Sequence, residues 1–248
     1  MKRIAILGLL LGLPLLAQAA APRMLSADIP ATGINTLAIT VGVGELRITP
    51  STDNTVQVQV SLEQKSREFL WFFHWQSRAT TQEIQTAQIA RQRQGQRLLL
   101  SLTTPGRLSN DDVKQKWIIQ VPARLAVDLN MKVGQATING VAGGVRADLN
   151  VGELDVDVPG GALSAKINVG QISATTGTTQ PGAIALSSTI GEAALYMNGK
   201  YISHAGEHSG LGRSINFNGN GPDHMKLSVN VGEVDLHVEP LNDGKNRS

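Results

Sequence analysis

Apolar and polar residues alternate in short segments along most of this chain, and a glycine interrupts each segment. In residues 145–151 every second residue is apolar, and the alternation changes phase after Gly152, where Leu154 and Val156 are the apolar residues. Alternation with a period of two is typical of a β-strand with one buried face. A change of phase requires a bend or a bulge, and glycine accepts the backbone angles of such a corner. Each segment is therefore expected to be a strand, a glycine corner and a second strand.

The segment recurs along the chain at a nearly constant step. Gly134, Gly152, Gly170 and Gly191 follow one another at intervals of 18, 18 and 21 residues. With two more distant copies, the predicted corner residues are Gly44, Gly134, Gly152, Gly170, Gly191 and Gly232. A unit this short cannot bury its own apolar face, but stacked copies share one core.

The expected fold class is therefore all-β. We expect a single-domain β-solenoid of stacked strand–glycine corner–strand turns of about 18–21 residues, with clean repeats over 125–239. A run of hairpins in a sandwich is the alternative. The alternation assigns the residue before each glycine to the shared core, as in Val133, Val151 and Val169.

If the copies stack in the order of the sequence, two further features are expected. The gap from Gly191 to Gly232 is 41 residues, so a degenerate turn with a bulge is expected around Gly212. The residues after the glycines would then form one row. In chain order this row is Gln135, Glu153, Gln171, Glu192, Arg213 and Glu233. Such an order keeps glutamates apart and so avoids repulsion between neighbours.

Residues 1–21 have the pattern of a secretory signal peptide, which leaves 22–248 as the mature domain. Lys2 and Arg3 precede an apolar stretch, and Ala17-Gln18-Ala19 is a small-x-small cleavage site. No other stretch approaches the roughly 20 apolar residues of a membrane span. The chain contains no cysteine, so no disulfide and no lipid anchor are expected. The expected location is the periplasm, or outside the cell after secretion.

The net charge gives no reason to expect a nucleic-acid partner. The chain has 22 Lys and Arg residues against 20 Asp and Glu residues. Removal of Lys2 and Arg3 with the signal peptide leaves 20 of each. Nucleic-acid binding usually requires a strong basic excess, which is lacking here.

Residues 65–97 break the repeat and form an insertion with an unusual composition. Its candidate partner-contact residues are Phe69, Trp71, Phe72, Phe73 and Trp75. The Gln-rich stretch 81–93 favours a helix. One interpretation is that the insertion caps an open end of the sheet, whose unpaired strand edge could otherwise pair with another chain. The other is that it contacts a partner or a membrane surface, because aromatic residues beside arginine are favoured there.

No arrangement typical of a catalytic, cofactor-binding or metal site was found. His204 and His208 lie four residues apart in a Gly-rich stretch, but without the order of a metalloprotease motif. Nucleotide-binding loops and the GxSxG nucleophile motif are absent from the sequence. Asp155 and Asp157 share one strand face, where they are most simply solvated. Their equivalents in the adjacent copies, Thr137 and Ser173, are not acidic. We therefore expect no enzyme and no cofactor.

The motif [IVL]-N-V-G-[EQ]-[LIV] at 149–154, 167–172 and 229–234 carries a resemblance. Together with the strand KWIIQVP at 116–122, it resembles a bacterial β-strand-repeat domain of unknown function, the "putative adhesin" family, over residues 35–238. The resemblance implies the repeat fold and provides no catalytic residues.

The expected function is an exported, non-catalytic structural or binding module of the cell envelope, with an unidentified protein or glycan as partner. The alternatives are a polysaccharide-active β-helix enzyme and an envelope-stress regulatory protein.

Overall fold

A computed structural model describes residues 22–64, 81–104, 113–202 and 206–239, and almost all of them are in β-strands. The strands are β1 (Arg23–Pro30), β2 (Thr36–Ser51), β3 (Thr55–Gln64), β4 (Gln88–Gln94), β5 (Arg97–Thr103), β6 (Val113–Pro122), β7 (Ala126–Asn139), β8 (Val145–Val158), β9 (Leu163–Thr176), β10 (Pro181–Ile190), β11 (Ala193–Met197), β12 (Lys200–Tyr201), β13 (Gly206–Ser209), β14 (Gly212–Asn218) and β15 (Asp223–Val238). The one described helix is α1 (Thr81–Thr86). The predicted all-β fold is confirmed.

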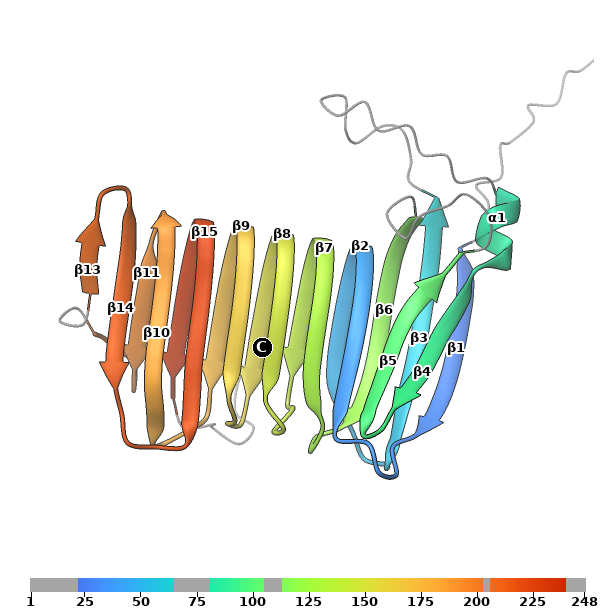
Figure 1. Cartoon of the computed structure of the whole chain (residues 1–248), viewed down its shortest axis with the longest axis horizontal. Helices are drawn as coiled ribbons and strands as arrows, with labels where there is room; N and C mark the ends of the chain where they lie inside the picture. Colours follow the sequence, from blue (N-terminus) through green and yellow to red (C-terminus); the bar gives the residue numbers. More distant parts are fainter. Residues whose placement is uncertain (1–21, 65–80, 105–112, 203–205, 240–248) are drawn as a thin grey trace, which may run out of the picture.

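The strands belong to one continuous sheet that does not close on itself (Figure 1). Its order is β1-β3-β6-β2-β7-β8-β9-β15-β10-β14-β13, with β4 and β5 branching from β2, and β11 and β12 branching from β15. The predicted solenoid is not confirmed, since the pairing describes an open sheet. No helix in the described part of the chain is long and apolar enough to cross a membrane.

Five of the strands, β2, β7, β8, β9 and β15, run through their glycine and stack in parallel. The register pairs Gly44 with Gly134, Gly134 with Gly152, Gly152 with Gly170, and Gly170 with Gly232. We call the part of each strand before its glycine the leading arm and the part after it the trailing arm.

The contacts of Gly152 show why glycine is needed at the bend. Its φ is +146°, and a Cβ there would lie 1.8 Å from the carbonyl oxygen of Gly134. Gly170 would meet Gly152 at the same distance. A side chain is therefore excluded both by its backbone angles and by the neighbouring strand.

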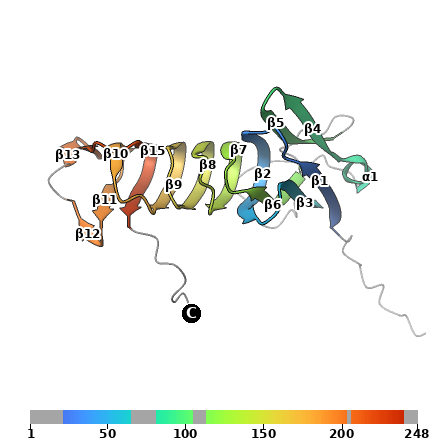
Figure 2. The same ribbon diagram turned by 90° about the horizontal axis from the view of Figure 1, so that it is seen from below.

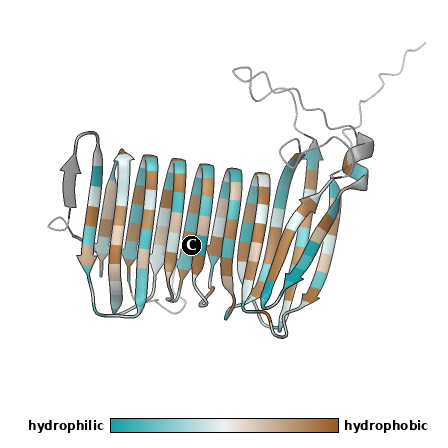
Figure 3. Ribbon diagram, viewed as in Figure 1, coloured by the Kyte–Doolittle hydropathy of each residue, from teal (hydrophilic) through white to brown (hydrophobic). Residues whose placement is uncertain are grey.

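The apolar residues of both arms belong to one core cluster. Leu149 in the leading arm and Leu154 and Val156 in the trailing arm are buried in it. Figure 3 shows the resulting alternation of hydrophobic and hydrophilic residues along the strands. The phase change seen in the sequence thus keeps apolar side chains in the core on both sides of the bend.

The residue before each glycine is not in this core, contrary to the prediction. Val151 and Val169 are 39% and 47% exposed. The ladder pairs Leu149 with Ile167 and Val151 with Val169, but it omits the pair between them. Both strands bend at this position with their register unchanged, so the next side chain turns outward at the corner instead of inward.

The stacking order also differs from the prediction near the C-terminus. β15 inserts between β9 and β10, so the copy at Gly232 stacks directly on the copy at Gly170. The region around Gly212 is not a degenerate turn of the stack, because β14 runs antiparallel to β10. The strands near the C-terminus therefore do not stack in the order of the sequence. The chain reverses direction between β10 and β14, and β15 then pairs between β9 and β10.

At the other end of the sheet, the two arms of β2 pair with different strands. Thr36–Thr40 pair with β5, whereas Val43–Ser51 pair with β6. In Figure 2, β4 and β5 therefore lie on one side and β1, β3 and β6 on the other. The predicted helix in 81–93 extends over Thr81–Thr86 only, because Gln88–Gln94 pair with β5 as a strand instead.

Candidate functional site

The outward residues of the leading arms form rows across the sheet. One row contains Asp128, Arg146, Ser164 and Lys226, which the register places on adjacent strands from β7 to β15. Adjacent strands lie about 4.8 Å apart. Side chains far apart in the sequence, such as Arg146 and Lys226, therefore face solvent on the same surface.

This row borders a shallow groove of about 660 Å³ at the start of the leading arms. Its polar and charged lining includes Arg97, Asp128, Arg146, Lys226 and His224. Its apolar lining comes from the first core residue of each arm, as in Val127, Val145, Leu163 and Met225. A groove of this size with an apolar floor and a few charged groups is typical of ligand-binding sites.

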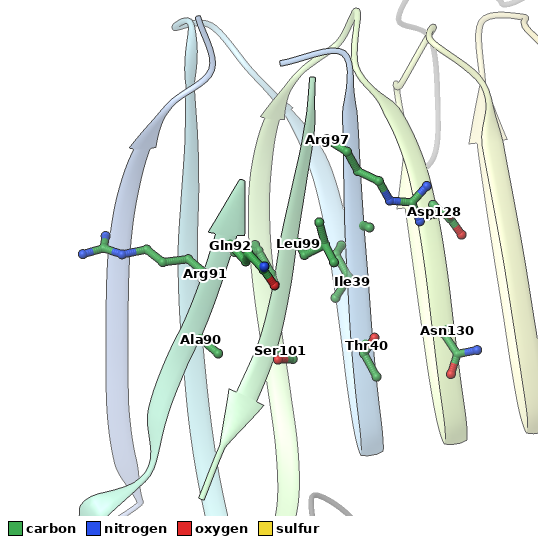
Figure 4. Close-up of a pocket in the computed structure, with 12 residues that line it drawn as sticks. Ile39, Thr40, Ala90, Arg91, Gln92, Arg97, Leu99, Ser101, Asp128 and Asn130 are labelled. Carbon is green, nitrogen blue, oxygen red and sulfur yellow. Dashed lines mark hydrogen bonds and ion pairs between the residues drawn. The ribbon is translucent and has the colours of Figure 1, made fainter. Parts of the chain in front are cut away.

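A smaller pocket of about 250 Å³ lies next to the groove, between the β4–β5 hairpin and strands β2 and β7. Arg97 and Asp128 line both hollows and form an ion pair. Figure 4 shows Arg97 reaching from β5 toward Asp128 on β7, with Ser101, Thr40 and Asn130 below them. The pair therefore stands where the pocket and the groove meet.

The charges of the groove suit an anionic ligand. Arg97, Arg146 and Lys226 are cationic, and the one carboxylate in the lining, Asp128, is already paired with Arg97. Arginine presents donors in a planar fork that matches carboxylate and phosphate groups. His224 accepts a hydrogen bond at Nδ1 from the backbone N–H of Ala183, at 3.2 Å. This bond fixes the ring orientation at the groove wall.

The trailing arms carry the opposite charge. The outward residues of the trailing arms include one arginine, Arg47, and several carboxylates. These carboxylates are Glu45, Glu153, Asp155, Asp157, Glu233 and Asp235. Lys114 and Lys116 of β6 pair with Glu45 at 3.3 and 3.7 Å. The two faces of the bent sheet therefore differ in charge, although residues 22–248 together carry no net charge.

Asp155 and Asp157 lie on this acidic face. In the row of Asp155, Thr137 and Ser173 are the immediate neighbours, and Asp235 of β15 follows Ser173. Burial raises the pKa of Asp235 above its usual value of 3.8, and the nearby Glu233 raises it further, against a smaller opposite effect of His237. The described residues contain no group of three or more His, Cys, Asp or Glu side chains that could hold a metal ion.

The residues of the groove were not predicted from the sequence. Arg146 and Asp128 occupy equivalent positions in their copies, and this spacing could have been noticed. Lys226 reaches the same surface only because β15 stacks on β9. Arg97 lies at the end of the predicted insertion 65–97, and it was not singled out there.

Several candidates from the sequence fall outside the described residues. They are the aromatic residues Phe69, Trp71, Phe72, Phe73 and Trp75, together with His204 and the signal peptide 1–21. The partner contact proposed for the aromatic segment therefore stays a prediction.

The fold resembles that of solved bacterial proteins. One is described as a putative cell adhesion protein from Clostridium sporogenes; it has 13% sequence identity and a TM-score of 0.47, with 88% of this chain and 100% of that chain covered. Another is described as a putative adhesin from Bacteroides fragilis, with 13% identity, a TM-score of 0.38, and 86% and 97% covered. No protein-family model and no curated protein matches the chain. The printed descriptions, a cell adhesion protein and an adhesin, accord with the name of the family that the repeat motif resembles.

Proposed function

We propose that this protein is an exported, non-catalytic binding module of the cell envelope that holds an anionic glycan segment in the leading-arm groove. The observation that supports this most is the lining of the groove, in which Arg97, Arg146 and Lys226 surround a single, already paired carboxylate. Carboxylate or phosphate groups of a glycan would accept hydrogen bonds from these cations, and the apolar floor would contact the sugar rings.

The arrangement favours binding over catalysis. General acid and base chemistry on a glycan requires two carboxyl groups on either side of the reacting bond. The groove offers one carboxylate, Asp128, and its ion pair with Arg97 occupies it. Export is inferred from the signal-like segment 1–21.

The groove can be tested with polygalacturonate as an anionic probe and dextran as a neutral one. Arg146→Gln combined with Lys226→Gln should weaken polygalacturonate binding about tenfold or more, since each charged hydrogen bond contributes roughly 1.5–3 kcal/mol. Calorimetric titration would measure the affinity, and it should fall with added salt.

Arg47→Gln is the matched control, because Arg47 is an exposed arginine on the trailing arm of β2. This variant should bind polygalacturonate as the unchanged protein does. Equal binding of dextran and polygalacturonate, or an equal loss in both variants, would count against the groove as the site.

The aromatic segment provides a separate test of envelope association. Trp71→Ala combined with Trp75→Ala should reduce the fraction of protein that sediments with envelope membranes and leave the circular dichroism spectrum unchanged. Unaltered fractionation would argue against a contact role for Phe69, Trp71, Phe72, Phe73 and Trp75.

A polysaccharide-active enzyme is the second candidate, and the stacking of β15 favours it. Asp155 and Asp235 share one outward row at a separation of two strands, about 10 Å. This spacing is close to that of paired carboxylates in inverting glycosidases, and the raised pKa of Asp235 suits an acid. This candidate predicts that the mature protein releases reducing ends from a glycan and that Asp235→Asn abolishes the release.

A further inference from the structure

We propose that two copies of this protein associate side by side along a ridge of valine residues at the corner of the bent strands. The ridge consists of the residues that directly precede the corner glycines. In spatial order these are Val43, Val133, Val151, Val169, Val231 and Ile190.

The ridge is a continuous apolar surface that faces solvent. Val151, Val169, Val231 and Ile190 are 39–47% exposed, and Val43 and Val133 are partly buried. Four of the eight exposed large hydrophobic residues among the described residues lie in this one row. Six strands at about 4.8 Å give it a length of roughly 24 Å. Exposed apolar residues gathered in this way mark interaction surfaces more often than single ones do.

The two borders of the ridge have different hydrogen-bonding character. The leading-arm border contains Asn150, Asn168 and Asn230, whose amides form a ladder: Asn168 Nδ2 donates to Asn150 Oδ1 at 2.8 Å, and Asn230 Nδ2 donates to Asn168 Oδ1 at 2.9 Å. A second N–H of each amide is available for another acceptor. Lys132 continues this border on β7.

The trailing-arm border is rich in acceptors. It contains Gln135, Glu153, Gln171 and Glu233, and Gln135 Nε2 donates to Glu153 Oε2 at 2.9 Å. The pairs that flank Glu192 place it beside Glu233, so the last two positions of this border are both acidic. The carboxylates of this border are those of Glu153, Glu233 and Glu192, and Glu192 also pairs with Arg213 at 3.7 Å.

The difference between the two borders favours a second copy of this chain as the partner, in one orientation. A two-fold axis parallel to the ridge brings the asparagine border of one copy onto the glutamate border of the other. Amide donors then meet carboxylate acceptors on both sides of the apolar contact. A two-fold axis across the ridge would instead place glutamates on glutamates, which is unfavourable. A second copy related by a two-fold axis parallel to the ridge thus covers the apolar row and pairs donors with acceptors along both borders.

The size of the ridge indicates a modest affinity. A single apolar row with two polar borders falls at the low end of protein interfaces. We therefore expect a monomer–dimer equilibrium in the range of about 1 to 100 µM. Sedimentation velocity of the mature chain over this range should show a shift from monomer to dimer.

Charged substitutions on the ridge should abolish the shift. Val169→Asp combined with Val231→Asp is expected to weaken dimerisation by about tenfold or more, because it buries charges at the contact. Met24→Asp is the matched control, since Met24 is 63% exposed and lies on β1 at the far end of the sheet, with β3 and β6 between it and β2. Circular dichroism and thermal melting would verify that both variants are folded.

Cysteine cross-linking tests the orientation, and the chain has no native cysteine to interfere. In the parallel arrangement, equivalent residues meet across the axis. Val151→Cys alone and Val231→Cys alone should therefore each form disulfide-linked dimers under mild oxidation. An equal mixture of the two should give few mixed dimers, because these positions lie two strands, about 10 Å, apart.

Two results would overturn the proposal. Preferential formation of mixed Val151→Cys–Val231→Cys dimers would show that the axis crosses the ridge. A monomer throughout the concentration range would mean that the valine row serves strand formation alone, as β-branched residues often do. Neither result affects the proposed groove, which lies on the leading arms away from the corner.

Discussion

At the scale of single residues, the corner glycines explain how one motif can repeat across the sheet. Each glycine lacks the side chain that would strike the carbonyl of the glycine stacked against it, as for Gly152 against Gly134 at 1.8 Å. The need for a residue without a side chain therefore recurs on each stacked strand, and each copy must provide its own glycine. The close contact also sets the register, because a slip by one residue would place a side chain against that carbonyl.

Replacing Gly152 with Ala should destabilise the protein by about 2–4 kcal/mol, because it adds both backbone strain and a clash with Gly134. Urea denaturation would measure the change. Gly95→Ala is the control: its φ is +59°, but nothing lies within 4 Å of the added Cβ. The control should lose only the roughly 1–2 kcal/mol of left-handed strain. Equal losses would show that the contact between stacked glycines is unimportant.

The carboxyl of Asp235 makes folding stability depend on pH. Its pKa is raised in the folded protein, so the folded state holds this proton more tightly than the unfolded state. Stability then falls as the pH rises from 3.8 through the raised pKa. Asp235→Asn should therefore be more stable than the unchanged protein at pH 7, by up to about 0.5 kcal/mol.

This stability difference between Asp235→Asn and the unchanged protein should shrink below pH 3.8, where the carboxyl is protonated in both states. Urea midpoints at pH 7 and at acidic pH would reveal the trend. A variant that is less stable than the unchanged protein at pH 7 would show that the charged carboxylate makes a favourable contact.

At the scale of elements, β15 joins the two parts of the sheet. It pairs along its whole length with β9, while β10 and β11 pair with its opposite edge. The last long strand of the chain therefore holds the segment before it in place. The N-terminal strands do not depend on β15 in this way, because β2, β7, β8 and β9 stack in chain order.

A chain that ends at residue 222, without β15, should lose the order of residues 181–218 and keep that of the strands up to β9. Limited proteolysis would then remove the C-terminal segment and leave a resistant fragment that ends near residue 176. A chain that ends at residue 177 should give the same fragment. Continued protection of β10 and β14 without β15 would show that this segment folds by itself.

Most strands could be predicted from the sequence, whereas their neighbours could not. The alternation in 145–158 and 163–176 predicts strands that match β8 and β9. In 81–93, the strand β4 was missed, because its stability comes from pairing with β5 and its own sequence is polar and Gln-rich. Tertiary pairing overrides local propensity at such an edge.

At the scale of the whole molecule, the bend separates charges that cancel in the total. Residues 22–248 contain equal numbers of acidic and basic residues. Nevertheless, the trailing arms expose Glu153, Asp155 and Glu233, and the leading arms expose Arg146 and Lys226. A partner that approaches the trailing arms therefore meets a negative electrostatic potential, and one that approaches the leading arms meets a positive potential.

A protein comprising residues 22–248 should therefore bind both an anion and a cation exchanger at pH 7 and low salt. Neutralising the trailing face by Glu153→Gln, Asp155→Asn and Glu233→Gln should reduce retention on the anion exchanger alone. Arg146→Gln with Lys226→Gln should reduce retention on the cation exchanger alone. Elution salt concentrations would measure both effects. A shift of both variants on both resins would mean that net charge, and not its separation, governs binding.

The local pattern of this chain is enough to predict its repeating unit: a strand, a glycine corner and a second strand, with apolar side chains in phase on both arms. These features follow from sterics and burial within one segment. The tertiary structure alone decided which copy stacks on which, because equivalent segments offer nearly the same backbone and side-chain partners. The placement of β15 beside β9 brings Lys226 into the row of Arg146 and Asp235 into the row of Asp155. The bend at each corner, where the stacked strands turn together, placed the valine row in the solvent and not in the core.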